Sequence, residues 1–397
     1  MVEPTDPGPA PGGPTRLFTP AFIALSVAEF AYFTAAGLMI PVTPLFAAGP
    51  LRANEVGVGF AVGAFSITAL ALRPFAGRTA DRRGRRPLLI GGALLFAVAT
   101  AAHVLVPDLA SLVGLRLLLG VAEAFFFVAG FAVVADLAPP GRAGEALSFN
   151  SLSLYLGIAI GPLVGELLLD AGGFTLAWLG GASLALAAAA IATRMPETAS
   201  GMGAGEGPAP LFNRAAIGPS LGLFTGIAGM AGFFAFVALY AQDLGMEGSR
   251  LVLLEFGLLV VGCRIAFARL PDRVPPFPLA AAALGLIAVG LTVAAAVPTV
   301  EGLLAGAAIM AVGVAFTTPA FFAAIFARVR PSERGAASGT ASLFLDLAFG
   351  GGPMLLGLVA GVTGIPAAFG GAAALAAVGA AGTLLIPLAR RRTVAAT

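Results

Sequence analysis

Residues 73–87 read RPFAGRTADRRGRRP, and long apolar segments flank this stretch on both sides. Between Arg78 and Arg86 lie five arginines and one aspartate, Asp81, in a short loop between two candidate membrane spans. Gly77 and Gly84 lie at the two ends of this loop. Glycine permits close helix approach and backbone conformations that other residues avoid. Dense arginine in a short loop marks the cytoplasmic side of a membrane protein, so we expect this loop to be cytoplasmic.

The composition indicates a chain that is surrounded mainly by lipid. Of 397 residues, 59% are hydrophobic and 11% are charged, and the mean hydropathy is +0.98. A soluble domain carries about 25% charged residues. A span needs roughly 20 apolar residues, so the length allows about a dozen spans joined by short loops.

The same composition excludes several classes of function. All 22 basic residues are arginine, so the lysine of a phosphate-binding P-loop is missing. His103 is the single histidine, which excludes an HExxH zinc site, and we expect it to be structural. Cys263 is the single cysteine and forbids an internal disulfide. We therefore expect no enzyme, no cofactor or metal and no nucleic-acid partner, and we attribute the net charge of +2 to membrane topology.

Apolar runs bounded by proline, glycine or charge predict twelve spans in two sets. The first set is 17–40, 55–76, 87–106, 108–135, 144–168 and 172–193, and the second is 218–241, 249–268, 277–297, 300–327, 334–361 and 365–388. The first run is too long for a signal-peptide core and contains Glu29, so we expect it to remain uncleaved. The domain organisation that follows is a disordered N-terminus, an N-terminal half, a Gly- and Pro-rich linker, a C-terminal half and a tail, at 1–16, 17–193, 194–217, 218–388 and 389–397.

Arginine placement and an internal repeat support this division. With both termini inside, 17 arginines lie in cytoplasmic segments and two in external loops. The two sets also repeat at a constant offset of 191 residues: Arg73 corresponds to Arg264, and Gly161-Pro162 to Gly352-Pro353. The fold class that we expect is an all-α membrane protein with 12 transmembrane helices in two pseudo-symmetric six-helix halves.

The loop at 77–86 resembles the signature between helices 2 and 3 of the major facilitator superfamily, and the resemblance covers nearly the whole chain. It implies a conformational latch in which Asp81 contacts the start of helix 11 near 332–335, and Arg85 pairs with Asp136. The latch comprises Gly77, Asp81, Arg82, Gly84, Arg85 and Asp136. The alternative is a plain positive-inside loop. In the second half Ala268 replaces the first glycine, so a weaker latch is expected there.

Two further motifs extend the resemblance to drug–proton antiporters of the bacterial inner membrane. Helix 5 carries Gly157, Gly161, Pro162 and Gly165, which match the antiporter motif of proton-coupled exporters; generic helix packing is the alternative. Helix 4 carries Arg116, whose family counterpart is tied to proton transfer, although Leu119 stands where the family often has glutamine. Glu123 lies two turns further on the same face, and a structural arginine pair is the alternative.

Carboxylates inside the spans are candidates for proton coupling. Glu29 lies mid-span in helix 1 and Asp346 mid-span in helix 11, where isolated carboxylates are expected to bind and release protons. With Arg116 and Glu123 they form the predicted proton-coupling set, and Glu255 in helix 8 is a weaker candidate. Residues 40–44, IPVTP, resemble the motif at the end of helix 1 in drug–proton antiporters.

The aromatic residues predict an apolar cargo. The chain has 30 phenylalanines but only three asparagines and one glutamine, whereas a sugar pocket needs polar partners. The substrate cavity is predicted to include Tyr32, Phe126, Phe233, Phe234 and Glu255; lipid-facing bulk is the alternative for most of the phenylalanines.

The sequence thus favours proton-driven export of a small apolar or amphipathic compound by alternating access. We expect a monomer in the bacterial inner membrane, with protons and the lipid bilayer as its other partners. A proton symporter that imports a nutrient remains an alternative, as does a polytopic protein without transport activity.

Overall fold

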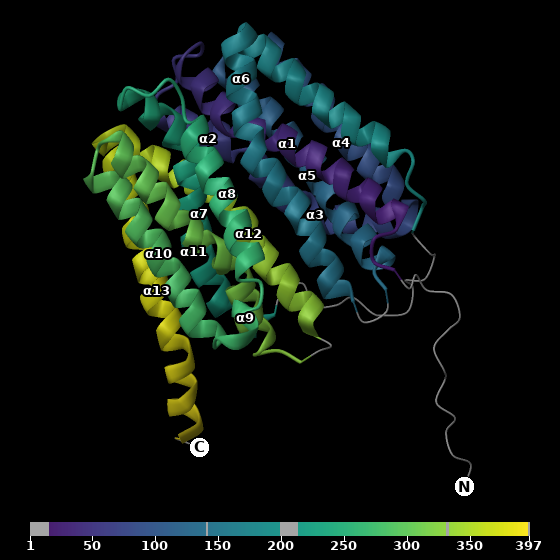
Figure 1. The fold of residues 1–397 in the computed structure, drawn as a ribbon, viewed down its shortest axis with the longest axis vertical. Helices are drawn as coiled ribbons and strands as arrows, with labels where there is room; N and C mark the ends of the chain where they lie inside the picture. Colours follow the sequence, from purple (N-terminus) through teal and green to yellow (C-terminus); the bar gives the residue numbers. More distant parts are fainter. Residues whose placement is uncertain (1–15, 140–141, 199–212, 331–332, 396–397) are drawn as a thin grey trace.

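The computed structural model describes residues 16–139, 142–198, 213–330 and 333–395, and its regular structure is helical throughout these ranges (Figure 1). In chain order the helices are α1 (Pro20–Ala48), α2 (Glu55–Gly63), α3 (Phe65–Arg83), α4 (Arg85–Ala102), the 3₁₀ turn η1 (His103–Leu105), α5 (Leu109–Leu137), α6 (Ala143–Ala192), α7 (Arg214–Asp243), α8 (Arg250–Ala266), α9 (Leu270–Arg273), α10 (Pro276–Ala296), α11 (Val300–Phe326), α12 (Arg334–Thr363) and α13 (Ile365–Ala395).

Ten helical stretches in the described part of the chain are long and apolar enough to cross a membrane. One of them joins α2 and α3 as Glu55–Ala80, and another covers 48 residues of α6. Within α6, Gly172 and Gly173 leave helical geometry, with φ of −161° and 66°, and the chain changes direction there (Figure 1). α8 has 17 residues and covers most of the expected span 249–268.

Polar side chains cap the N-termini of several helices. Thr19 accepts a hydrogen bond from the Phe22 backbone N–H at 3.2 Å, and Asn54 accepts one from Gly57 at 2.9 Å. These bonds satisfy N–H groups that have no partner in the first turn of a helix.

The first helix is longer than its apolar run predicts. The expected span ends at residue 40, whereas α1 continues through Pro41 and Pro44 to Ala48. Proline removes a backbone hydrogen bond and normally ends a helix. Here all residues from Pro41 to Ala47 are buried, and this packing offsets the lost hydrogen bonds.

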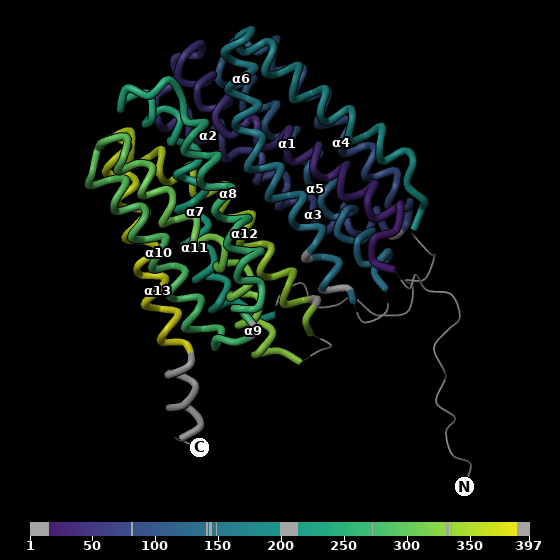
Figure 2. Tube along the Cα trace, viewed as in Figure 1, coloured from purple at the N-terminus to yellow at the C-terminus, as the bar shows by residue number. Residues whose placement is uncertain are grey.

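Helices from the first part of the chain pack mainly with one another, and so do those from the second part. α1 packs on α6, and α4 packs on α5 and α6, whereas α7 packs on α12 and α13, and α10 on α11 and α13. Figure 1 shows α1 and α3–α6 on one side of the molecule and α7–α13 on the other, and the chain trace in Figure 2 follows the same division. The two groups meet where α2 and α3 lie against α12 and where α8 lies against α6, hereafter the α3–α12 and α8–α6 interfaces.

Close backbone contacts repeat at the offset that the sequence predicts. A Cβ added at Gly161 of α6 would lie 2.7 Å from the carbonyl carbon of Gly37 in α1. A Cβ added at Gly352 of α12 would lie 2.9 Å from the corresponding atom of Ala228 in α7. Both members of the second pair lie 191 residues after those of the first.

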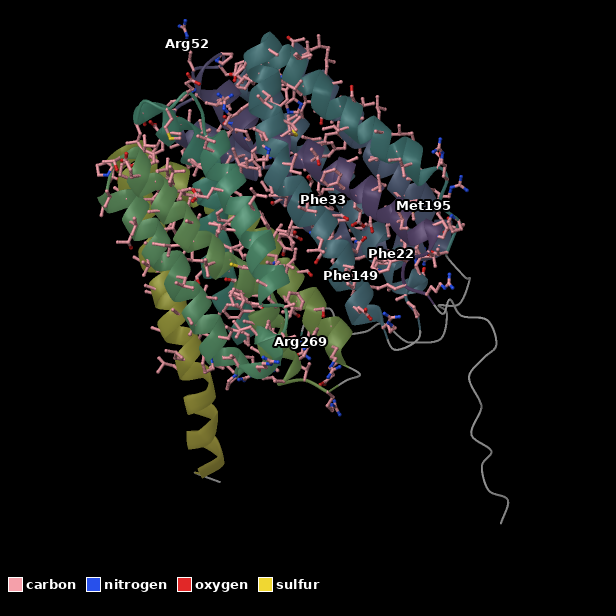
Figure 3. All side chains as sticks on the ribbon, viewed as in Figure 1. Phe22, Phe33, Arg52, Phe149, Met195 and Arg269 are labelled. Atoms are coloured by element: carbon pink, nitrogen blue, oxygen red, sulfur yellow. The ribbon has the colours of Figure 1, made fainter. Side chains whose placement is uncertain are left out.

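Parts of three predicted segments lie outside the described residues. These are residues 1–15 of the N-terminus, 199–212 of the linker and 396–397 of the tail. Figure 3 labels residues at the two ends of the helix bundle: Arg52 lies at one end, and Phe22, Met195 and Arg269 lie toward the other. We refer to these as the Arg52 end and the Arg269 end.

Candidate functional site

A buried carboxylate pairs with an amide in the first group of helices. Glu29 of α1 is 5% exposed, and Asn150 Nδ2 of α6 donates a hydrogen bond to its Oε2 at 2.5 Å. Ser26 Oγ in turn donates to Asn150 Oδ1 at 3.3 Å. No arginine forms an ion pair with Glu29 in the described part of the chain. Glu29 therefore has a neutral hydrogen-bond partner and no compensating charge.

A pocket with aromatic walls surrounds this carboxylate. It is lined by Glu29, Asn150 and Ser151 together with Phe33, Phe126, Phe127, Phe131, Leu147 and Leu154. Gly130 of α5 allows the close approach, since a Cβ there would lie 2.6 Å from Glu29 Oε1. The cavity is small in this conformation, about 30 Å³, so it sets one acidic group against a mostly apolar wall without enclosing a cargo-sized space.

The predicted cavity residues divide between this pocket and the helix packing. Tyr32 stacks on Phe126 with ring centroids 3.8 Å apart, and it supports the pocket wall without lining it. Phe233 packs on Phe369, and Phe234 packs on Phe256; neither lines the Glu29 pocket. Glu255 lies apart from it on α8.

Asp346 is not the isolated carboxylate that the sequence predicts. Arg73 of α3 contacts it with two groups: Nη2 donates to Oδ1 at 2.7 Å, and Nε donates to Oδ2. The pair crosses the α3–α12 interface, and the Arg73 guanidinium lies 4.7 Å from the centre of the Phe127 ring. Because Phe127 also lines the Glu29 pocket, the ion pair borders that pocket.

Arg264 makes the corresponding contact in the α8–α6 interface. Its Nη2 donates to the Tyr155 hydroxyl at 2.7 Å, and its guanidinium lies 3.9 Å from the centre of that ring. Arg264 and Tyr155 are related to Arg73 and Asp346 by the 191-residue offset. Each interface therefore has an arginine at the corresponding position of the repeat. Its partner is Asp346 in the α3–α12 interface and Tyr155 in the α8–α6 interface.

Arg116 binds backbone carbonyls, which matches the structural alternative. Its Nε and Nη2 donate to the carbonyl oxygens of Ala61 and Val62, each at 3.0 Å. These oxygens lie next to the break between α2 and α3, where helical hydrogen bonding is interrupted. Glu123 forms no ion pair with Arg116, and among the described residues it makes no hydrogen bond. Arg116 makes no contact with Glu29 in this conformation.

The basic loop makes one of the contacts that the family resemblance implies. Arg85 pairs with Asp136 of α5 and donates to the Ala132 carbonyl at 3.0 Å. Gly84 has φ of 96°, in the region that favours glycine. Gly77 makes no close approach in this conformation, because a Cβ there would meet no atom within 4 Å. Arg82 is exposed, and the Asp81 side chain lies outside what the structure describes.

The glycine motif of the fifth predicted span, 144–168, lies in α6 and forms its contact with α1. Cβ atoms added at Gly157, Gly161 and Gly165 would each approach backbone atoms of α1 within 3.0 Å. Pro162 lies in the same stretch of α6. The motif thus allows these two helices to touch along their backbones.

Sequence reasoning missed four polar residues that matter in the structure. Asn150 and Tyr155 of α6 partner Glu29 and Arg264. Glu197 accepts hydrogen bonds from the backbone N–H groups of Arg85 and Arg86, at 2.9 and 3.2 Å, and Glu166 is described below. Asn150, a polar residue inside a predicted span, was the one of these residues that the sequence could have indicated as functional. Glu166 and Glu197 lie near predicted span ends, where charge is common.

Comparisons with known proteins assign the family. Residues 25–300 match the model of the Major Facilitator Superfamily. The chain belongs to the major facilitator superfamily. An MFS-type transporter of Salmonella typhimurium is 31% identical over 369 residues, covering 90% of this chain and 94% of its own. A second, from Burkholderia mallei, is 32% identical over 385 residues and 93% of each chain.

Solved structures share the fold. A bacterial homologue of the human lysosomal transporter Spinster, in an inward-facing and occupied conformation, gives a TM-score of 0.77 at 16% identity, covering 93% of this chain and 97% of that one. The nucleoside transporter NupG gives 0.76 at 13% identity, covering 92% and 99%. The protein is thus a multi-pass membrane protein and a secondary transporter, not an enzyme.

Proposed function

We propose that this transporter exports a small apolar or amphipathic compound in exchange for protons, by alternating access. The observation that carries the proposal is the Glu29 pocket, where a buried acid has an amide partner and no cation. An uncompensated charge in a span is costly, and binding a proton removes that cost. The aromatic walls suit an apolar cargo. Gly157, Gly161 and Gly165 of α6, which resemble the antiporter motif, favour export.

We further propose twelve spans in two six-helix halves. The ten candidate helices give this number if α6 counts as two spans divided at Gly172–Gly173, and if α8 counts as one. The arginine distribution favours cytoplasmic termini in a bacterial inner membrane, with the Arg52 end outside. Single cysteines in a Cys263→Ala background test the orientation with an impermeant maleimide. Asn54→Cys should label from outside and Ser200→Cys only from inside.

Proton coupling is tested with Glu29→Gln, which keeps the shape of the protonated acid. The protein is reconstituted in proteoliposomes with a pH dye, and a panel of apolar and amphipathic compounds is added. Compounds that drive proton flux in the parent protein should lose it in Glu29→Gln. Glu247→Gln is the control, because Glu247 is 90% exposed. Full proton flux in Glu29→Gln would assign coupling to Glu123 or Asp346.

Transport direction is measured in everted vesicles. An exporter takes the active compounds up into such vesicles when their interior is made acidic. A nutrient symporter would release them instead.

A further inference from the structure

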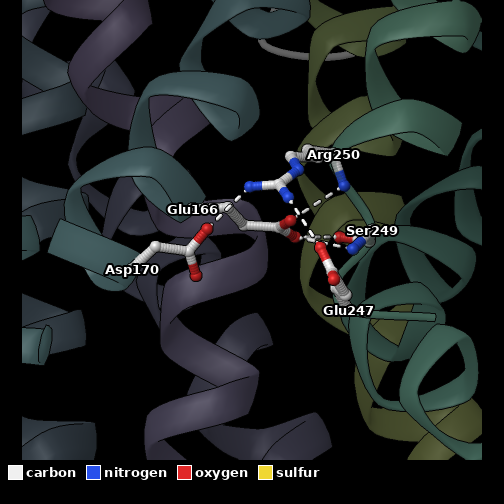
Figure 4. A network of polar contacts seen from close by, with 5 residues as sticks. All are labelled: Glu166, Asp170, Glu247, Ser249 and Arg250. Carbon is white, nitrogen blue, oxygen red and sulfur yellow. Dashed lines mark hydrogen bonds and ion pairs between the residues drawn. The ribbon is translucent and has the colours of Figure 1, made fainter. Parts of the chain in front are cut away.

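Another buried carboxylate lies outside the Glu29 pocket, between α6 and α8 (Figure 4). Glu166 of α6 is 3% exposed. Its Oε1 accepts hydrogen bonds from the backbone N–H and the hydroxyl of Ser249, at 2.8 and 2.5 Å. Its Oε2 accepts one from the Arg250 backbone N–H at 2.9 Å. One carboxylate from the first group of helices thus accepts three hydrogen bonds from the second.

These donors begin α8. Ser249 precedes the helix and Arg250 is its first residue, so Glu166 caps a helix N-terminus from another helix. An N-terminus carries partial positive charge and N–H groups without partners in its own helix, both of which favour an anion. Gly248 leaves room for the acid, because a Cβ there would lie 3.0 Å from the Glu166 Cδ.

A partly exposed ion-pair network surrounds this cap. Arg250 Nη1 pairs with Asp170 of α6 at 2.6 Å, and Arg250 Nη2 pairs with Glu247 at 3.2 Å. The side chains of Asp170 and Glu247 are 60% and 90% exposed, so solvent screens both pairs. The buried contact of Glu166 is therefore the stronger link between the two helices.

The cap lies at the Arg52 end of the bundle. α8 begins at Arg250 and leads through α9 to the opposite end, where Figure 3 labels Arg269. At the same level in the other interface, Gly357 of α12 meets α2: its added Cβ would lie 3.2 Å from Gly59 Cα. Both interfaces are thus closed toward the Arg52 end, and the Glu166 contact is the charged one.

We propose that Glu166 is the gate residue that holds the Arg52 end closed and must leave the α8 N-terminus once in each transport cycle. The inference rests on the proposed alternating access, since only that mechanism requires this end to open. Removing the carboxylate takes away three charge-assisted hydrogen bonds that the closed state makes. The open state makes none of them, so its population rises.

The test measures the opening directly, without a cargo. Spin labels are attached at Leu105→Cys and Ala296→Cys in a Cys263→Ala background. These residues follow α4 and end α10, at the Arg52 end of each group of helices. Pulsed electron resonance then gives the distance distribution between the labels. Glu166→Ala should raise the ratio of open to closed molecules about tenfold, which corresponds to about 1.4 kcal/mol.

Two further variants keep the proposal testable if Glu166→Ala does not fold. Glu166→Gln keeps the side-chain shape and loses the charge, and it should give a smaller shift in the same direction. Gly248→Ala leaves Glu166 intact but displaces its carboxylate, and it should also favour the open state. Asp243→Asn is the matched control and should leave the distribution unchanged, because Asp243 is exposed at the end of α7 and forms no ion pair among the described residues.

An unchanged distribution in Glu166→Gln and Gly248→Ala overturns the proposal. So does a shift of equal size in Asp243→Asn, because the effect would then be one of general surface charge. The readout needs neither protons nor cargo. Failure of proton coupling at Glu29 would therefore leave the gate intact, and a failed gate would leave the Glu29 result standing.

Discussion

The α3–α12 and α8–α6 interfaces occupy corresponding positions in the repeat but use different chemistry. In the first, glycines meet at the Arg52 end, and an Arg73–Asp346 ion pair lies further along. In the second, a carboxylate caps a helix at the Arg52 end, and an arginine meets a tyrosine further along. Glu166 and Gly357 are related by the 191-residue offset, as are Tyr155 and Asp346. Residues related by the offset thus lie in corresponding contacts of the two interfaces, while the charged groups differ in their distance from the Arg52 end.

This difference predicts unequal roles for the two interfaces. The glycine contact is short-ranged and lost with a small separation, whereas ion pairs and charged hydrogen bonds weaken more gradually with distance. We expect the α8–α6 interface to control the Arg52 end. We expect the α3–α12 interface to control the middle of the bundle, beside the Glu29 pocket.

The largest expected effect comes from Asp346→Asn. Breaking a buried ion pair leaves Arg73 without its counter-charge, which costs about 3–5 kcal/mol in comparable cases. Transport should fall by about 100-fold or more. Reversing the pair, with Arg73→Asp and Asp346→Arg together, should restore part of the activity. No recovery in the reversed pair, with the protein normally inserted, would show that Asp346 acts beyond pairing.

Gly59→Val tests the glycine contact of the α3–α12 interface. The added side chain meets the α12 backbone at Pro353, and overpacking costs about 1–3 kcal/mol. We expect about a tenfold loss of transport and longer distances between labels at the Arg52 end. Gly91→Val is the control, because a Cβ at Gly91 meets no atom within 4 Å. Equal losses in both variants would point to helix propensity as the cause.

Two variants of Tyr155 distinguish its hydrogen bond to Arg264 from its cation–π contact with the same arginine. Tyr155→Phe keeps the ring beneath Arg264 and loses one hydrogen bond, worth about 1 kcal/mol. Tyr155→Leu loses the cation–π contact as well. Transport rates measured side by side should fall a few-fold for phenylalanine and further for leucine. Tyr155→Asp would give this interface the ion pair of the other; if its activity falls to the level of Asp346→Asn, the two positions are not interchangeable.

The helical membrane fold could be predicted from the sequence because it depends on long, regular patterns. Apolar runs define helices whatever their neighbours, and the offset of 191 residues survives in the backbone contacts of Gly161 and Gly352. The Arg85–Asp136 pair was also predicted, from the family resemblance.

Pairings across helices could not be predicted in the same way. The partner of Asp346 is 273 residues away, and nothing in either local sequence distinguishes an isolated acid from a paired one. Arg116 was assigned to proton transfer because charge in a span is rarely idle. The break between α2 and α3, which supplies its carbonyl partners, has no proline or charge to signal it.

The smallest expected effect lies outside both interfaces and compares two equivalent helix caps. Asp108 caps α5 by accepting from the Ser111 backbone N–H at 2.8 Å, and Thr299, 191 residues later, caps α11 by accepting from Gly302 at 3.1 Å. Hydrogen bonds from Ser111 lower the pKa of Asp108 below its ordinary value of 3.8. Because the folded-state pKa is lowered, the cap stabilises the protein fully above the ordinary value of 3.8. This stabilisation is lost as the pH falls through the folded-state pKa.

Asp108→Ala should therefore lower the melting temperature slightly at pH 7, and the difference from the parent protein should shrink as the pH falls below 3.8 and vanish once the pH is below the lowered folded-state pKa. Thr299→Ala should keep part of its effect at low pH, because the hydroxyl that accepts from Gly302 does not titrate, whereas the part due to its hydrogen bond with the Glu301 carboxyl group changes as that group is protonated. Scanning calorimetry or thermal shift across this pH range makes the comparison. Neither variant should change the label distances at the Arg52 end, because neither cap lies in an interface. A distance change in Asp108→Ala would mean that loss of overall stability alone opens the bundle, and the effects of Gly59→Val and Tyr155→Leu would then need no special role for the two interfaces.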